Sequence, residues 1–201
     1  NNGRQTGAPV LVDLAWRVAR PALFQLDAER AHRTVLETLE RWPRLTEGLL
    51  GSVLPAPPAG LETTLGPLAV RSPLGLAAGL DKDGEAAHAW AALGFGFVEL
   101  GTVTPRPQAG NPLPRLFRLP DEGALINRMG FNNGGVDALR ARLVAMEDQD
   151  NRPAVPLGAN VGKNKDTPND RAEEDYLAGV QALRGLVDWF TVNVSSPNTP
   201  G

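Results

Sequence analysis

The 201-residue sequence contains no cysteine and only two histidines, His32 and His88. The lack of cysteine excludes a disulfide framework, a thiolate nucleophile and a cysteine-ligated zinc or iron–sulfur centre. Two histidines are too few for a metal site built of histidine alone, and neither has an obvious catalytic role. We therefore expect no metal cofactor.

The sequence also lacks a basic excess and long apolar runs. Its 20 basic and 23 acidic residues give a net charge of −3, which argues against sequence-independent nucleic-acid binding. No stretch approaches the roughly 20 apolar residues of a membrane-spanning helix, and the first residues do not resemble a signal peptide. With 42% hydrophobic residues, one domain with a buried core is expected. The missing initiator Met and the polar end SSPNTPG suggest part of a longer chain.

Residues 1–50 are predicted to form a helical region separate from the rest. Asp27 is a suitable N-cap for a helix with apolar residues at helical spacing, namely Ala28, Ala31, Val35, Leu39 and Trp42. A shorter helix precedes it, and Pro21 is expected to separate the two. Such amphipathic helices pack on a domain or lie on a membrane surface. The prolines and glycines of residues 53–66 then indicate a linker.

From residue 73 the sequence alternates between apolar strands and helices. Strands are predicted at 73–80, 95–103, 155–161 and 189–194, and helices at 85–93, around 136–143 and around 176–187. A proline-rich loop of about thirty residues follows the second strand and contains a hairpin around LFRLPDEGALI. We therefore expect an α/β fold in which residues 51–201 form about the first half of a (β/α)8 TIM-type barrel. An open doubly wound sheet is the alternative, but its glycine-rich dinucleotide turn is absent.

Each predicted strand ends in a polar cluster. The carboxyl ends of barrel strands meet at one rim, so we expect a single site there. It would contain Lys82 together with amides and small hydroxyls, namely Thr102, Asn127, Asn132, Asn160, Asn193, Ser195, Ser196 and Asn198. Amides donate and accept hydrogen bonds without net charge, and they suit a planar heterocycle such as a flavin or a pyrimidine.

Lys82 stands out because Lys82, Lys163 and Lys165 are the only lysines among the 20 basic residues. A compact ammonium near a flavin stabilises negative charge on the reduced ring or binds a carboxylate. The alternative is a solvated lysine in a turn. The acidic residues beside it, Asp81 and Asp83, are more typical of turn caps than of a catalytic pair.

Five sequence blocks resemble, in order and spacing, those of the membrane-associated, quinone-dependent class of dihydroorotate dehydrogenases. They are SPLGLAAGLDKDGEA, LGFGFVELGTVTPRPQAGNP, PRLFRLPDEGALINRMGFNNGG, GANVGKNKDT and NVSSPNTPG. The N-terminal segment LFQLDAERAHRTVLETL is similar to the extra helical pair that distinguishes this class. The resemblance runs from about residue 20 to the last residue, and it favours contact of the N-terminal helices with a membrane.

The resemblance implies a barrel enzyme that oxidises (S)-dihydroorotate to orotate in pyrimidine biosynthesis and passes electrons to a membrane quinone. Its cofactor would be FMN, bound by Ala78, Gly79, Leu80, Asp81, Lys82, Thr102, Asn160 and Asn193. The substrate would contact Lys82, Asn127, Arg128, Met129, Gly130, Phe131, Asn193 and Asn198. Ser196 would be the catalytic base, where the soluble class has cysteine, and His32 and Arg118 resemble residues of the quinone tunnel. The implied location is the cytoplasmic side of the cell inner membrane, with residues 1–50 as peripheral contact.

Two departures from the family pattern are visible. Leu113 occupies a position where the family often has arginine, and the later barrel strands are missing, so the fragment alone is expected to be inactive. Two other functions remain open. One is an FMN barrel oxidoreductase that acts on a pyrimidine-like ring with a soluble acceptor, and the other is a non-catalytic membrane-surface fragment.

Overall fold

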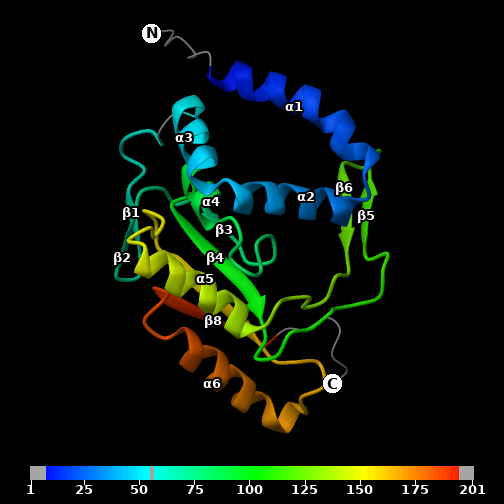
Figure 1. Cartoon of the computed structure of the whole chain (residues 1–201), viewed down its shortest axis with the longest axis vertical. Helices are drawn as coiled ribbons and strands as arrows, with labels where there is room; N and C mark the ends of the chain where they lie inside the picture. Colours follow the sequence, from blue (N-terminus) through cyan, green and yellow to red (C-terminus); the bar gives the residue numbers. More distant parts are fainter. Residues whose placement is uncertain (1–7, 55–56, 195–201) are drawn as a thin grey trace.

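Three helices precede the sheet in this computed structural model, which describes residues 8–54 and 57–194. They are α1 (Ala8–Gln25), α2 (Ala28–Arg41) and α3 (Pro43–Val53). In Figure 1, α1 lies at the top edge of the view, away from α5 and α6, and α2 runs between α1 and the sheet. In the described part of the chain, no helix combines the length and the apolar character needed to cross a membrane.

The boundary between α1 and α2 differs from the sequence prediction. Helix α1 continues through Pro21 to Gln25, so the expected separation at Pro21 is wrong. A proline removes one helical hydrogen bond, but α1 continues past Pro21 and ends four residues later, at Gln25. Asp27 caps α2 as predicted, because its carboxylate accepts from the backbone N–H of Glu29 at 2.9 Å and of Arg30 at 3.2 Å. The guanidinium of Arg118 donates to the carbonyls of Leu23 and Leu26 at the end of α1.

The predicted linker at residues 53–66 is partly structured, so that prediction is wrong in part. Helix α3 extends to Val53, so the boundary expected after residue 50 lies inside it. Strand β1 (Thr63–Leu65) then pairs antiparallel with β2 (Leu68–Val70), and Gly66 turns between them with φ of 58°.

Four parallel strands form the main sheet, in the order β3 (Gly75–Leu76), β4 (Phe97–Val103), β7 (Leu157–Gly162) and β8 (Trp189–Asn193). The intervening helices are α4 (Ala87–Ala92), α5 (Val136–Asp148) and α6 (Ala172–Leu183), with the short 3-10 helix η1 (Asn169–Arg171) before α6. Neighbouring strands follow one another in sequence, as in a barrel, whereas the doubly wound alternative reverses its order. The first strand is shorter than predicted, because residues 77–80 turn away after Leu76.

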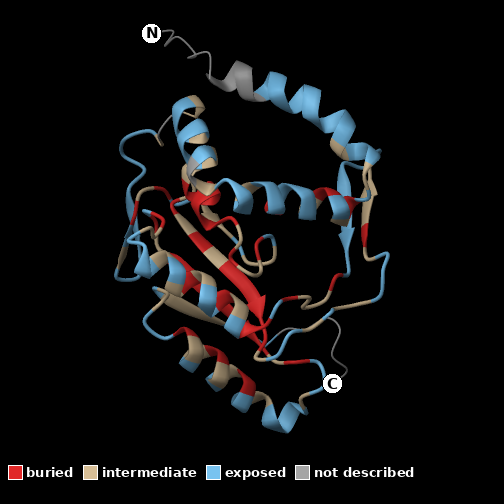
Figure 2. Cartoon of the chain, viewed as in Figure 1, coloured by how far each residue is buried: buried red, intermediate tan, exposed pale blue. Residues whose placement is uncertain are grey.

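The core lies between the sheet and its helices. Alternate residues of β4 and β7, among them Val98, Leu100 and Leu157, are fully buried against Leu139 of α5 and Leu183 of α6. In Figure 2 the buried positions concentrate along β4 and on the helix faces turned toward it. Burial of each large aliphatic side chain contributes roughly 1.5–3 kcal/mol, so this layer fixes the strands that carry the site.

The opposite face of the sheet carries aromatic and polar side chains. Phe97 and Trp189 meet edge to face with ring centroids 5.9 Å apart. Gly158 lies beneath the indole, since an added Cβ would come within 2.0 Å of Trp189. The same alternation places Glu99, Asn160 and Asn193 on this face.

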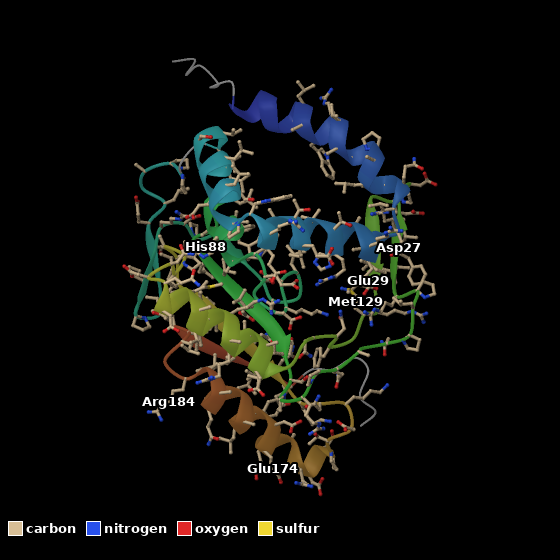
Figure 3. The ribbon with its side chains drawn as sticks, viewed as in Figure 1. Asp27, Glu29, His88, Met129, Glu174 and Arg184 are labelled. Atoms are coloured by element: carbon tan, nitrogen blue, oxygen red, sulfur yellow. The ribbon has the colours of Figure 1, made fainter. Side chains whose placement is uncertain are left out.

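The long loop after β4 contains the predicted hairpin, formed by β5 (Leu116–Leu119) and β6 (Ala124–Asn127). Figure 1 shows it upright beside the junction of α1 and α2. At the other end of α2, α3 packs against α4, where the buried His88 has its Nδ1 3.8 Å from Glu47 Oε2 (Figure 3). The N-terminal helices are thus held to the sheet domain near both ends of α2, and the ion pairs Arg33–Glu85 and Glu40–Arg142, each at 2.9 Å, also join α2 to it.

Candidate functional site

The turn after β3 holds Lys82 against the segment that follows β6. Its ammonium donates to the carbonyl of Gly130 at 3.1 Å and to Oδ1 of Asn132. Burial, together with the nearby Arg115 guanidinium, lowers the pKa of Lys82 to about 8. An ammonium has three donors, and its contacts with residues 8–54 and 57–194 use two of them, which leaves the third for an anionic or carbonyl ligand.

A network of amides lies at the carboxyl ends of β4, β7 and β8. Thr102 Oγ1 donates to Asn160 Oδ1 at 2.6 Å, and Asn193 Nδ2 donates to Thr102 Oγ1 at 3.1 Å and to Asn160 Oδ1 at 3.3 Å. Asn160 Nδ2 donates to Glu99 Oε1 at 2.7 Å. The strand ends therefore bring together three of the residues selected from the sequence.

Backbone hydrogen bonds join this network to the Lys82 turn. The N–H of Gly79 donates to Gly101 O at 2.7 Å, and the N–H of Gly101 donates to Asp81 O at 3.3 Å. Gly79 has φ of +111°, and among the described residues no heavy atom lies within 4 Å of the position that its Cβ would take. The backbone at this turn is accordingly open to close approach by a ligand.

Asp81 belongs to this turn, but its side chain does not face a ligand. The carboxylate is fully buried and accepts from the N–H of Glu85 at 2.8 Å, of Ala86 at 2.8 Å and from Trp90 Nε1 at 2.9 Å. The side chain of Asp81 is therefore not open to the expected cofactor, and its backbone carbonyl accepts from the N–H of Gly101. Its side chain anchors the turn to α4, which agrees with a capping role.

The expected substrate residues after β6 point in different directions. Gly130 offers its carbonyl to Lys82, and the ring of Phe131 lies beside Gly162 at the end of β7. Asn127 uses its Oδ1 to accept from the N–H of Met129 at 2.9 Å. Met129 is buried, and the guanidinium of Arg128 donates to Pro114 O on the outer side of the loop. Only part of this segment therefore faces Lys82.

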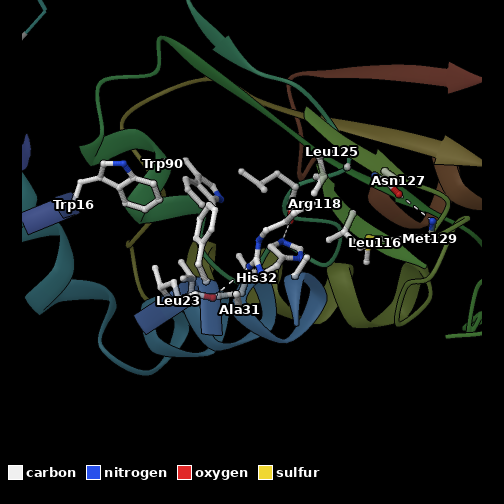
Figure 4. Close-up of a pocket in the computed structure, with 16 residues that line it drawn as sticks. Trp16, Leu23, Ala31, His32, Trp90, Leu116, Arg118, Leu125, Asn127 and Met129 are labelled. Carbon is white, nitrogen blue, oxygen red and sulfur yellow. Dashed lines mark hydrogen bonds between the residues drawn. The ribbon is translucent and has the colours of Figure 1, made fainter. Parts of the chain in front are cut away.

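An apolar cavity of about 640 Å³ lies between α1, α2, the hairpin and the turn at Gly79 and Leu80 (Figure 4). The polar side chains in its wall are His32, Arg118 and Asn127. His32 Nε2 lies 2.7 Å from Leu80 O, and the Arg118 guanidinium stacks 4.6 Å from the ring centroid of Phe24. Both expected tunnel residues thus line one cavity, and that cavity reaches the turn that carries Lys82.

The predicted base Ser196, and with it Ser195 and Asn198, lies outside the described residues. Two residues that the sequence reasoning did not select take part in the site. Glu99 is the carboxylate of the largely apolar strand β4. Residues two apart in a strand share a face, and Gly101 pairs with Asn160, so Glu99 lies on the same face of the sheet as Asn160. Arg115 lies near Lys82 through the fold of the loop, which no local sequence signal reveals.

The donor set of this site suits a planar heterocycle edged with N–H and C=O groups, with one anionic or carbonyl group near Lys82. Amide and hydroxyl groups supply matched donors and acceptors, and Lys82 supplies the single compact positive charge. The open backbone at Gly79 leaves space for a flat ring. These features define a parallel α/β protein whose strand ends fit a flavin-like ring beside an apolar cavity.

Comparisons with known proteins identify the family. The model of the dihydroorotate dehydrogenase family matches residues 60–201. A dihydroorotate dehydrogenase (quinone) of Stenotrophomonas maltophilia is 54% identical over 187 residues, which cover 92% of this chain and 51% of the relative. The protein of the same name from Deinococcus radiodurans is 52% identical over 198 residues, which cover 92% of this chain and 53% of the relative.

A solved structure gives the same result. The crystal structure of DHODH in complex with ferulenol from Eimeria tenella has a TM-score of 0.70 and 41% identity, and the match covers 86% of this chain and 45% of that one. The chain belongs to the dihydroorotate dehydrogenase family. It spans about half the length of the relatives it matches, and those cited are of the quinone type.

Proposed function

We propose that the protein containing this chain is a quinone-dependent dihydroorotate dehydrogenase of pyrimidine biosynthesis. It oxidises (S)-dihydroorotate to orotate and passes the electrons to a membrane quinone. One observation carries this proposal. The Lys82 turn has the amide network of Thr102, Asn160 and Asn193 on one side and the apolar cavity on the other, so a ring bound there contacts both.

The cofactor that fits this site is FMN. Thr102, Asn160, Asn193 and Lys82 would hold it, with the backbone of Ala78–Lys82 against the ring. When bound, FMN supplies the two-electron acceptor for the substrate. Sheet order supports a barrel of which these four strands are about half, since each pairs with the next parallel strand along the chain, and among the described residues β3 and β8 each have one unpaired edge.

The residues of the chain take separate roles on the substrate. The Lys82 ammonium binds an anionic group of dihydroorotate or the flavin ring edge, and the segment from Asn127 to Phe131, with Asn193 and Asn198, completes the pocket. Ser196 removes the substrate proton as the hydride leaves. Because a serine is a poor base at pH 7, this step requires a closed pocket that excludes bulk water and a relay for the proton.

The apolar cavity is proposed as the quinone route. Its wall is apolar apart from His32, Arg118 and Asn127, which suits a quinone ring with two carbonyl groups. Helix α1 exposes Leu14, Trp16 and Val18, and the region after α2 exposes Trp42 and Leu45. Such exposed apolar side chains on helices support peripheral contact with a membrane, from which quinone would enter; we place this contact on the cytoplasmic side of the inner membrane.

The test uses the full-length protein with its bound chromophore. Under anaerobic conditions, dihydroorotate should bleach the flavin spectrum, and a quinone analogue should restore it. Restoration by a soluble acceptor alone would indicate the other barrel oxidoreductase, and liposome binding without a yellow chromophore would indicate a non-catalytic module. Ser196→Ala should slow flavin reduction by orders of magnitude while FMN stays bound. Reduction at the wild-type rate would remove Ser196 from this role.

A further inference from the structure

An ion pair shielded from solvent connects α2 to the loop that precedes β5. Arg115 Nε donates to Glu29 Oε2 at 2.9 Å, and Arg115 Nη2 donates to Glu29 Oε1 at 2.6 Å. The two side chains are 11% and 13% exposed, so the pair is shielded from solvent on both sides. These hydrogen bonds hold the pKa of Glu29 below its ordinary value, which keeps the carboxylate charged. Figure 3 shows Glu29 at the end of α2 near Met129.

The same guanidinium organises the loop beneath Lys82. Arg115 Nη1 donates to Ala109 O at 2.5 Å and to Asn111 O at 2.9 Å. Asn111 in turn holds the segment after β6, because its N–H donates to Met129 O at 2.9 Å and its Nδ2 to Arg128 O at 2.7 Å. That segment provides the carbonyl of Gly130 and the amide of Asn132, which are the two acceptors for Lys82.

Helix α2 also touches the turn on the other side of Lys82. One turn after Glu29, His32 Nε2 lies 2.7 Å from Leu80 O, two residues before Lys82. Helix α2 therefore contacts both supports of the ammonium, the turn through His32 and the acceptor segment through Glu29 and Arg115. Its residues Ala31 and Val35 line the apolar cavity at the same time.

We propose that the Glu29–Arg115 ion pair is a positioning element for Lys82, which fixes the substrate-side acceptor segment to the helix that lines the apolar cavity. Neither residue contacts the reacting atoms. The inference deepens the proposed function and rests on it, since it assigns Lys82 to ligand binding. It implies that the N-terminal helices serve the substrate side of the site as well as the cavity.

Electrostatics gives the two partners opposite effects on Lys82. The charged groups that influence the ammonium are the cation Arg115 and the anions Asp83 and Glu29. Removal of the Glu29 charge should lower the pKa of Lys82, and removal of the Arg115 charge should raise it. If the two substitutions only disturbed packing, they would not shift the pKa of Lys82 in opposite directions.

The experiment measures orotate binding to the full-length holoenzyme from pH 6 to 10 by the flavin difference spectrum. Glu29→Gln and Arg115→Gln should each weaken binding by about tenfold at pH 7, within the range found for residues that act through a contact network. The pH midpoint of binding should fall in Glu29→Gln and rise in Arg115→Gln. Arg115→Lys keeps the charge but loses the bidentate geometry, so its midpoint should stay near that of wild type while affinity is partly restored.

Glu40→Gln is the matched control, because Glu40 also joins α2 to an arginine of the sheet domain, Arg142, at 2.9 Å. It should leave orotate affinity and midpoint unchanged. Wild-type orotate affinity in both Glu29→Gln and Arg115→Lys would overturn this inference but not the proposed function. The same holds if the pH midpoints of Glu29→Gln and Arg115→Gln move in the same direction. A wild-type holoenzyme that fails to bind orotate would overturn the proposed function as well. Glu29→Gln and Arg115→Lys keep the test decisive if Arg115→Gln does not fold.

Discussion

Replacement of Asp81 by alanine should destabilise the protein more than any other single carboxylate change near the site. The buried carboxylate accepts three hydrogen bonds, from the N–H of Glu85 and Ala86 and from Trp90 Nε1. A hydrogen bond to a charged group contributes about 1.5–3 kcal/mol, and each buried donor left without a partner costs about 1–3 kcal/mol. Relaxation of the turn and entry of water recover part of such a loss, so we expect about 4 kcal/mol in total.

The neighbouring carboxylate provides the control. Asp83 accepts one hydrogen bond, from the N–H of Gly134 at 2.8 Å, so Asp83→Ala should cost about 1 kcal/mol. Asp81→Asn should lie between the two, because the amide turns one N–H group toward donors that need an acceptor. Urea unfolding of the full-length holoenzyme, followed by tryptophan fluorescence, gives the three free energies. Equal losses in Asp81→Ala and Asp83→Ala would refute the reasoning from hydrogen bonds.

Two further predictions concern ligands of the full-length enzyme. Since the pKa of Lys82 is lowered to about 8, its ammonium is present below that pH and is lost above it. Orotate affinity should therefore fall about tenfold per pH unit above the pKa of Lys82, and the Lys82→Met variant should lose this pH dependence. The same slope in the wild type and in Lys82→Met would assign the titration to another group. Ala31→Phe adds a ring inside the apolar cavity of about 640 Å³. Quinone-dependent reoxidation should slow by more than about tenfold while reduction by dihydroorotate is retained, and stopped-flow absorbance separates the two; slowing of both half-reactions would contradict the assignment of the cavity.

Local signals in the sequence predicted the elements whose causes are local. Asp27 caps α2 because a carboxylate before an amphipathic stretch satisfies the free N–H groups of the first turn. The apolar strands and the hairpin after β4 followed from periodicity and from the turn residues between them. The polar ends of these strands indicated Lys82 and the amides, since parallel strands direct their carboxyl ends to one edge.

The features that sequence reasoning missed depend on distant partners. Pro21 was expected to end a helix, but the end of α1 is set by Asp27 and by Arg118, which reaches back from the hairpin. Residues 63–66 were assigned to the linker at 53–66 because a short exposed strand carries little periodicity, and they form the first strand and turn of the β1–β2 hairpin. Arg115 and Glu29 are 86 positions apart, so their pairing follows only from the completed fold.

The central claim is that one flat ring lies on the Lys82 turn, between the amide network and the apolar cavity. A crystal structure of the full-length protein with orotate bound tests it most directly. We expect FMN within hydrogen-bond distance of Lys82, Asn160 or Asn193, orotate near the segment of Gly130 that contacts Lys82, and the cavity leading to the flavin edge. Flavin density remote from these side chains, or orotate bound on another surface, would contradict the claim.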